Sequence, residues 1–223
     1  MDHQPRSRVR TKKSMRDRLI RLAARHPTWA LGFQDEVWWS RLARPSLHAW
    51  VKEDDVLRLV EQAVAKDDPD PKALACYGLL LRADPTEQNA TDQLWLRFVD
   101  GRPVSAVTID YLDWCCRKLH ADGKDALFLI WDNAPWHVSH LVRDWLRDHN
   151  RQVKQRGVGV RIIACYLPIK SPWLNAIEAT WVHGKRRVLE ADRLLTIAEL
   201  ADRVSDAYDC PHEPHLVMPK KVA

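Results

Sequence analysis

The sequence predicts an α/β domain with a mixed β-sheet, and two observations support that prediction. Segments patterned as strands dominate the first half of the chain, and a strand–helix–strand–helix order follows, which is typical of a sheet with helices packed against it. The 223 residues suffice for one sizeable core, and their composition, 46% hydrophobic and 29% charged, is that of a globular domain. No apolar run approaches the roughly 20 residues that cross a bilayer, so we expect no membrane association.

The N-terminal half is expected to be mostly extended. Residues 1–30 form a basic arm that contains a short helix at 15–24. A strand at 48–51 would close a hairpin with an earlier strand, and the DDPDP segment at 67–71 predicts a turn, because prolines and clustered acids oppose regular structure. The main strands of this half are predicted at 31–39, 74–81 and 93–99.

The C-terminal half alternates helices and strands. Helices are expected at 105–120 and 138–149, where apolar residues recur every three or four positions. The run LFLIW at 127–131 is continuously apolar, which is typical of a central strand covered on both faces. Ser171 and Pro172 predict the N-cap and first position of a further helix. A strand at 160–167 and a last helix at 196–208 complete the expected elements.

Asp35 interrupts the apolar face of its predicted strand. Alternate residues of a strand point to one side, so Leu31, Phe33 and Val37 share a face with Asp35. A carboxylate at such a position has to be paired or bound to a metal, because burying an isolated charge is costly. The adjacent Glu36 points to the opposite face, and we leave it out of the predicted metal site.

Two further acids break apolar patterns. Asp132 directly follows the apolar run 127–131, and in α/β sheets ligands bind beyond the carboxyl ends of the strands. Glu178 lies within the apolar stripe formed by Ile177 and Trp181 on the helix expected from Ser171. A satisfied structural carboxylate would explain any one of these acids equally well. Three of them on core elements indicate a site for a hard divalent cation.

Three segments carry a specific resemblance. FQDEVWW, LIWDNAPWH and YLPIKSPWLNAIEATW, which contain the three acids, are similar to the catalytic motifs of DDE-superfamily transposases, and most similar to the mariner-like branch of bacterial insertion sequences. The third motif is the most distinctive, because it is long and chemically mixed. The resemblance runs from Leu31 to about Arg187. It implies an RNase H-like catalytic domain at 31–210, between the basic arm at 1–30 and a C-terminal tail at 211–223.

The resemblance also implies a chemistry. The catalytic and metal-binding residues would be Asp35, Asp132 and Glu178. Neighbouring motif positions that would support them are Asn133, His137 and Asn175. The implied reaction is metal-dependent nicking of DNA followed by strand transfer, with two Mg²⁺ or Mn²⁺ ions flanking the phosphodiester. His137 could be a general base, or it could orient Asp132.

Basic clusters favour a polyanionic partner. The net charge is +5, and basic residues gather at 6–21, on one face of the helix expected at 138–149, and near the end of the third motif. One cluster alone would be an ordinary solvated face, but three of them beside the acidic motifs favour phosphate contacts. The candidate DNA-binding residues are Arg143, Arg147, Arg151, Lys185 and Arg186. We expect double-stranded DNA as the partner and a homodimer in the active complex.

Two features depart from the family pattern. Asp132 and Glu178 are 46 positions apart (178 − 132), wider than is usual for this branch, and we expect the basic stretch 151–159 to hold the extra residues. Family members normally carry an N-terminal helix-turn-helix region, and residues 1–30 are too short for one. The chain is therefore expected to be truncated or the second half of a split gene product, with little sequence preference in DNA binding.

Alternative functions have less support. A nuclease of the same fold would hydrolyse without joining strands, and a truncated or repurposed module would bind or only hydrolyse nucleic acid. Cys210, His212 and His215 could suggest zinc, but prolines interrupt this segment and no fourth ligand is evident. Five cysteines without a CxxC pair, and no apolar signal core, predict a reduced, cytoplasmic location. The resemblance to bacterial insertion sequences implies a bacterial cell, with the protein beside the nucleoid when DNA is bound.

Overall fold

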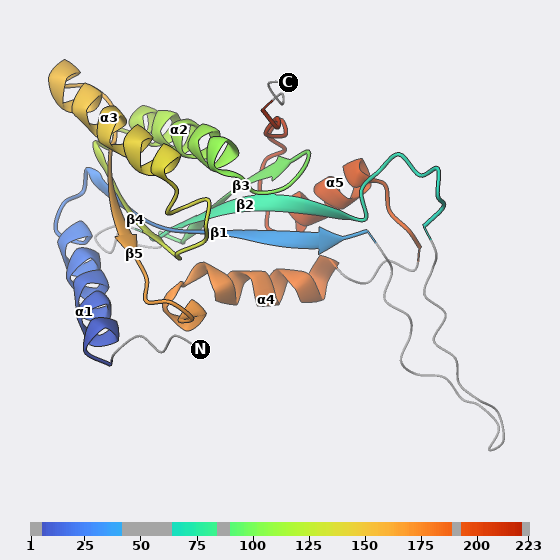
Figure 1. The fold of residues 1–223 in the computed structure, drawn as a ribbon, viewed down its shortest axis with the longest axis horizontal. Helices are drawn as coiled ribbons and strands as arrows, with labels where there is room; N and C mark the ends of the chain where they lie inside the picture. The colour runs from blue at the N-terminus through green and yellow to red at the C-terminus, as the bar shows by residue number, and fades with distance from the viewer. Residues whose placement is uncertain (1–5, 42–63, 84–89, 189–192, 220–223) are drawn as a thin grey trace.

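A computed structural model of the chain describes residues 6–41, 64–83, 90–188 and 193–219. The strand expected at 48–51 lies outside these residues. The described strands form one five-stranded sheet in the order β3-β2-β1-β4-β5 (Figure 1). The strands are β1 (Trp29–Ser40), β2 (Ala73–Leu81), β3 (Gln93–Val99), β4 (Ala126–Trp131) and β5 (Arg161–Tyr166). The helices are α1 (Arg6–Ala23), α2 (Ser105–Ala121), α3 (His140–Arg156), α4 (Ile177–Val188) and α5 (Ile197–Ala207), with a 3₁₀ turn η1 (Pro172–Leu174) before α4.

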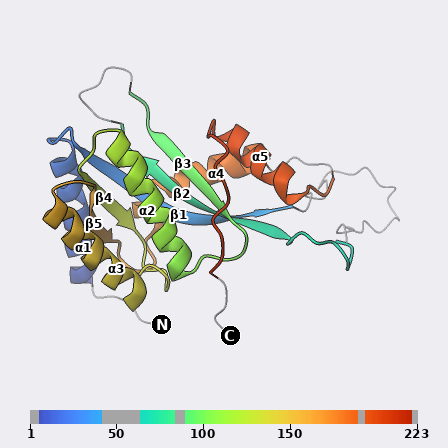
Figure 2. The same ribbon diagram turned by 90° about the horizontal axis from the view of Figure 1, so that it is seen from above.

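The sheet is mixed, as the sequence predicts. Strands β1, β2 and β3 pair antiparallel, whereas β4 runs parallel to both β1 and β5. Two hydrophobic cores lie on its two faces. One core packs α1, α4 and α5 against the sheet, and the other packs α2 and α3 (Figures 1 and 2). On β1, the side chains of Leu31, Phe33 and Val37 enter the first core, which confirms the face predicted for Asp35.

The pairing of β1 with β4 positions two of the predicted acids. Phe33 lies opposite Ile130 in this parallel register. Asp35 is two residues beyond Phe33, and Asp132 is two residues beyond Ile130, so both acids extend the same register toward the same end of the sheet. Because every second residue returns to the same face, both side chains are directed to the face that carries Phe33 and Ile130.

The helix boundary expected at Ser171 is wrong. No α-helix begins at Ser171: Pro172–Leu174 forms the single turn η1, the Ser171 side chain makes no capping hydrogen bond, and α4 starts at Ile177. The backbone of Asn175 is extended and its carbonyl accepts the N–H of Glu178, which places Glu178 in the first turn of α4. An acid is favoured there by the partial positive charge of the helix start.

Helix α3 is longer than the helix predicted at 138–149. Ser139 caps it by accepting the N–H of Val142 at 3.2 Å, and it ends at Gly157, whose φ of 68° is the left-handed conformation that favours glycine at this position. The stretch 151–159, expected to be an insertion, is therefore largely the last turns of α3. Leu141 is 55% exposed, so the buried stripe of this helix is narrower than its apolar pattern suggests.

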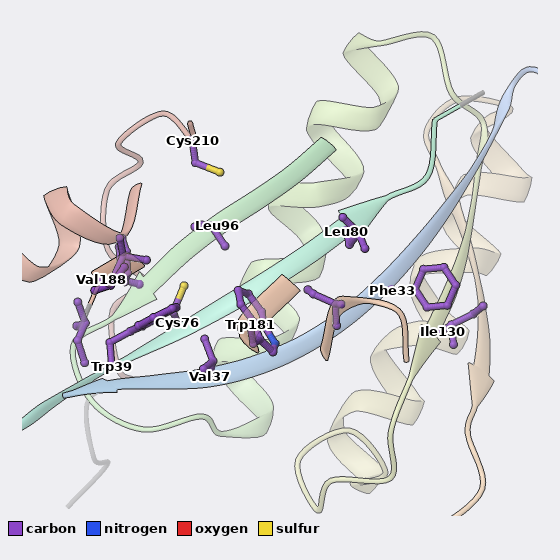
Figure 3. Packing of buried hydrophobic residues seen from close by; sticks show 14 of the residues in the cluster. Phe33, Val37, Trp39, Cys76, Leu80, Leu96, Ile130, Trp181, Val188 and Cys210 are labelled. Carbon is purple, nitrogen blue, oxygen red and sulfur yellow. The ribbon is translucent and has the colours of Figure 1, made fainter. Parts of the chain in front are cut away.

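A glycine in β2 makes room for the tryptophan of α4. Gly78 lies opposite Asp35 across the β1–β2 pair. A Cβ atom on Gly78 would come within 2.3 Å of Cη2 and 2.6 Å of Cζ2 of Trp181. Figure 3 shows Trp181 against the sheet, near Val37 and Trp39. The close approach of α4 to the centre of the sheet thus depends on a position without a side chain.

We expect Gly78→Ala to lower the free energy of unfolding by about 1–3 kcal/mol, the range for overpacking a core. Trp181→Phe removes the ring atoms that would collide, so the glycine substitution should cost less in that background. Urea denaturation of the wild type, both single variants and the double variant measures this coupling. Equal costs of Gly78→Ala in the two backgrounds would show that Trp181 does not constrain position 78.

Candidate active site

Asp35 is a largely buried carboxyl near the middle of the sheet. Burial raises the pKa of Asp35 to about 8, and the nearby negative charges of Glu36 and Glu178 raise it in the same direction. The opposing contributions are smaller and include a hydrogen bond at 3.0 Å from Trp181 Nε1 to Asp35 Oδ2. The sequence predicts Trp181 only as a core residue. Its contact with Asp35 arises because Gly78 leaves the indole room to reach the carboxylate.

Asp132 follows the last residue of β4, and its side chain is 52% exposed. Its Oδ1 accepts the backbone N–H of Ala134 at 2.8 Å and faces His137 Nδ1 at 2.8 Å. Partial burial opposes ionisation, but the hydrogen bonds from His137 and Ala134 overcome it and lower the pKa of Asp132. Oδ1 is therefore engaged within the protein, while half of the side chain faces solvent.

Glu178 faces Asp35 and Asp132 from α4. Partial burial raises the pKa of Glu178, the charge of Asp132 raises it further, and the charge of Lys185 lowers it. Glu178 in turn raises the pKa of Asp35. Glu178 thus lies close enough to Asp35 and to Asp132 for charge repulsion with each, although the three residues are far apart in the sequence.

This group of carboxyls suits a divalent cation in its chemistry. Hard oxygen donors are the ligands that Mg²⁺ and Mn²⁺ prefer, and a cation would relieve the repulsion that raises the pKa values of Asp35 and Glu178. Within the described residues, no three His, Cys, Asp or Glu side chains already form a cluster that could hold a metal ion. Glu178 therefore interacts electrostatically with both aspartates, but the three carboxyls do not form a preassembled metal-binding cluster.

His137 connects Asp132 to a carboxylate on the other face of the sheet. The His137 side chain is fully buried, with Nδ1 at 2.8 Å from Asp132 Oδ1 and Nε2 at 2.9 Å from Glu36 Oε1. Burial works against a charge on the ring, but the charge of Glu36 and the hydrogen bonds to both carboxylates prevail, and the pKa of His137 is raised to about 9. Both ring nitrogens lie within hydrogen-bonding distance of a carboxylate oxygen. This contact geometry favours the orienting role over that of a general base.

Glu36 is the acid left out of the predicted metal site. It does lie on the face opposite Asp35, and its side chain is 5% exposed. Gln34 Nε2 and Trp136 Nε1 donate to it at 2.7 and 3.0 Å, in addition to the contact with His137. The alternation of side chains along β1 correctly places Glu36 on the face opposite Asp35. It does not reveal that His137 connects Glu36 to Asp132.

The other two supporting residues fix loops. Asn133 Nδ2 donates to the carbonyl of Leu167 at 2.6 Å, which ties the loop after β4 to the segment after β5. Asn175 is buried, and its Nδ2 donates to the carbonyl of Gln34 at 3.0 Å. Asn175 thereby holds the start of α4 against β1 beside Asp35. Both residues position backbone near the carboxyls, and their direct involvement in chemistry stays a prediction.

The basic clusters lie on different sides of the sheet. On α3, Arg147 and Arg151 are exposed, and each is paired with an acid one turn earlier, Asp144 and Asp148. Lys185 and Arg186 are exposed on α4, on the side of the sheet that carries Asp35. Helix α1 lies on that same side (Figure 1) and is longer than the helix expected at 15–24.

Helix α1 is tied to the segment that leads to Glu178. Lys12 Nζ donates to the carbonyl of Leu167 at 3.1 Å, and an Arg16 guanidinium nitrogen donates to that of Leu174 at 2.9 Å. Its remaining cations include exposed side chains at Arg10, Lys13, Arg18 and Arg21. The basic arm is thus a helix seated beside the candidate site.

The cysteine and histidines considered for zinc have other partners. Cys210 is buried and its thiol contacts the carbonyl of Leu94 at 3.1 Å. His212 lies 3.1 Å from Asp202, and His215 lies 2.5 Å from Asp100. No metal cluster forms from this segment within the part of the chain that the structure describes.

Comparison with known proteins gives one family match. Residues 88–201 match the family model described as DDE superfamily endonuclease, a span that contains Asp132 and Glu178 but not Asp35. No curated protein matches the chain. In the part of the chain that the structure describes, no helix is both long and apolar enough to cross a membrane.

Several solved structures share the fold. The Mos1 mariner paired-end complex with Mn has a TM-score of 0.61 at 13% identity, over 95% of this chain and 57% of that one. The Mos1 strand transfer complex has a TM-score of 0.55 at 14% identity, over 94% and 56%. The Mos1 catalytic domain has a TM-score of 0.55 at 13% identity, over 95% and 85%. The chain spans little more than half of the Mos1 chains in the complexes, and its fold is the RNase H-like fold of their catalytic domain, as expected.

The raised pKa of Asp35 predicts a pH-dependent stability effect. An acid with a folded-state pKa above its ordinary value destabilises the fold progressively as the pH rises from about 4 to about 8, because the folded chain holds the proton more tightly than the unfolded chain. In the presence of a chelator, Asp35→Asn should therefore raise the melting temperature more at pH 8.5 than at pH 5.5. Asp125→Asn, an exposed acid at the other end of β4, is the control. An equal effect of Asp35→Asn at both pH values would contradict the assignment.

Proposed function

Because the chain belongs to the DDE superfamily endonucleases, we propose that it is the catalytic domain of a transposase that nicks DNA and transfers the freed strand. The observation that supports the proposal is the proximity of Glu178 to both Asp35 and Asp132: burial raises the pKa of Asp35 and of Glu178, and the charges of neighbouring acids raise both pKa values further. The solved structures of similar fold are named as Mos1 paired-end and strand transfer complexes, which supports DNA as the substrate.

Asp35, Asp132 and Glu178 would hold the divalent metal. Mg²⁺ or Mn²⁺, most simply as two ions, supplies Lewis-acid stabilisation of the attacking and leaving oxygens when bound. Similar Mos1 structures are named as complexes with Mn and with Mg. The chain's own contribution is to orient these carboxylates: Trp181 donates to Asp35, and His137 and Ala134 N–H fix Asp132. The remaining oxygens of both aspartates are then left for the metal.

The DNA would lie along the side of the sheet that carries α1 and α4. Exposed cations on α1 and the pair Lys185 and Arg186 on α4 belong to the side that holds Asp35. Arg143, Arg147 and Arg151 on α3 are further candidates for phosphate contacts, with a smaller expected share because two of them are paired with acids. We also propose a homodimer, since the similar structures are named as paired-end complexes, and a site of action beside the nucleoid.

Asp132→Asn should abolish metal-dependent nicking while leaving the melting temperature within a few degrees of the wild type. The substitution keeps the volume of the side chain and removes the charge that a divalent ion requires. Cleavage of a supercoiled plasmid in Mg²⁺ or Mn²⁺ measures it, with Asp125→Asn as the matched control at the start of β4. Nicking by Asp132→Asn at the wild-type rate would refute the proposed function.

A strand-joining assay separates a transposase from a nuclease of the same fold. The chain should join a labelled oligonucleotide with a free 3′-hydroxyl to plasmid DNA, since strand transfer uses the same carboxylates as nicking. Nicking without joining would favour the nuclease. Metal-independent binding without nicking would favour a repurposed binding module.

Lys185→Gln combined with Arg186→Gln should reduce the slope of log affinity against log salt by about two, because each lost phosphate contact releases about one counterion fewer. The triple α3 variant, Arg143, Arg147 and Arg151 each to Gln, should reduce the slope by less per residue. Fluorescence anisotropy with a DNA duplex at several salt concentrations measures both. An unchanged slope for the α4 variant would make this face ordinary solvated surface.

A further inference from the structure

Glu36 and Asp35 are consecutive residues whose side chains lie on opposite faces of β1. Strand alternation imposes this separation. Asp35 faces α4, while Glu36 lies with His137 and Trp136 on the side covered by α2 and α3. From the sequence, Glu36 is therefore expected to have no connection to the metal site. The contacts of His137 reverse that conclusion.

The connection is a chain of hydrogen bonds from Glu36 through His137 to Asp132. The two distances are 2.9 Å at Nε2 and 2.8 Å at Nδ1. The ring is fixed by its surroundings: it is fully buried, and it stacks on Trp131 with ring centroids 4.6 Å apart and planes 19° apart. Its backbone carbonyl also accepts the Tyr166 hydroxyl at 3.3 Å. These contacts hold the ring in the orientation that directs Nδ1 to Asp132 Oδ1 and Nε2 to Glu36 Oε1.

Glu36 is itself oriented at both carboxylate oxygens. Oε1 accepts from Gln34 at 2.7 Å and from His137, and Oε2 accepts the Trp136 indole N–H at 3.0 Å. A buried carboxylate with this many donors has no rotational freedom to exchange partners. Glu36 is therefore the fixed end of the hydrogen-bond chain. Asp132, at the other end, is half exposed and would be free to move without its contact to His137.

We propose that Glu36 is a positioning residue for the metal ligand Asp132 and acts on it only through His137. This inference rests on the proposed function, and it adds a residue that touches neither metal nor DNA. Outer partners that orient a metal ligand typically contribute 10–100-fold to metal affinity. Their effect here would be to hold Oδ1 of Asp132 against His137, so that the remaining oxygen is presented to the cation.

A double-mutant cycle on Mn²⁺ affinity tests the proposal. Glu36→Gln and His137→Phe should each weaken Mn²⁺ binding about 10–100-fold. His137→Phe keeps the ring stacked on Trp131 and removes both hydrogen bonds. Because Glu36 acts through His137, Glu36→Gln should have almost no further effect in the His137→Phe background. Isothermal titration of the full chain with MnCl₂ supplies the affinities, with no need for DNA cleavage.

The double-mutant cycle distinguishes a Glu36 that positions Asp132 through His137 from a Glu36 that attracts the cation only by its negative charge. If Glu36 acted only as a negative charge near the cation, its effect would be the same in both backgrounds. A His137→Phe variant that binds Mn²⁺ as tightly as the wild type would likewise show that His137 does not connect Glu36 to the cation. Either result overturns the proposal. Asp68→Asn is the matched control: Asp68 is a mostly buried carboxylate paired with the buried Arg41, so its loss should lower the melting temperature and leave Mn²⁺ affinity unchanged.

The wild type distinguishes failure of this inference from failure of the proposed function. If the wild type binds Mn²⁺ and Glu36→Gln binds it within twofold, only the role of Glu36 is refuted. If the wild type does not bind Mn²⁺, the proposed function fails and this inference fails with it. Should Glu36→Gln not fold, Trp136→Phe removes one donor to Glu36 and should weaken Mn²⁺ binding in the same direction by a smaller factor; unchanged affinity would overturn the proposal.

Discussion

The parallel pairing of β1 with β4 is the constraint on which the candidate site depends. Phe33 opposite Ile130 sets the register, and two residues further along each strand stand Asp35 and Asp132. A slip of one residue would turn one carboxylate to the other face of the sheet. The apolar residues on both strands oppose such a slip, because it would also move Phe33 or Ile130 out of the core that it fills and into the core on the other face. The same packing that stabilises the sheet thus fixes where the acids meet.

Burying carboxylates beside this packing costs desolvation free energy, and the two aspartates differ in how well hydrogen bonds offset it. Asp132 lies at a strand end and is stabilised as an anion by His137 and the Ala134 amide. Asp35 lies deeper, where hydrogen bonds from the Glu36 backbone and from Trp181 do not offset desolvation and two neighbouring acids. The most strained charge is therefore the one nearest the centre of the sheet. A divalent cation is the partner that would convert this repulsion into binding energy.

The sequence predicted the sheet and both of its faces, because alternation and apolar runs report burial directly, whereas the roles of the acids stay a prediction. Helix ends were harder to predict. Ser171 and Pro172 match the pattern of an N-cap and a first helical position, but Ser171 makes no capping hydrogen bond and Pro172 begins only a single 3₁₀ turn. Asn175 precedes α4, and its side chain donates to the carbonyl of Gln34 on β1. Glu36, Trp181 and Gly78 were missed in their roles because each acts across elements. Only the tertiary structure places the Trp181 indole over Gly78, and His137 between Glu36 and Asp132.

The central claim is that Asp35, Asp132 and Glu178 share one divalent metal site. Anomalous X-ray diffraction from crystals grown with Mn²⁺ tests it most directly, since the ion reveals its own position. We predict an anomalous peak about 2.0–2.2 Å from a carboxylate oxygen of each of the three residues, close to the ideal distance for a small hard cation. A peak elsewhere, or one bound to Asp132 alone, would contradict this claim.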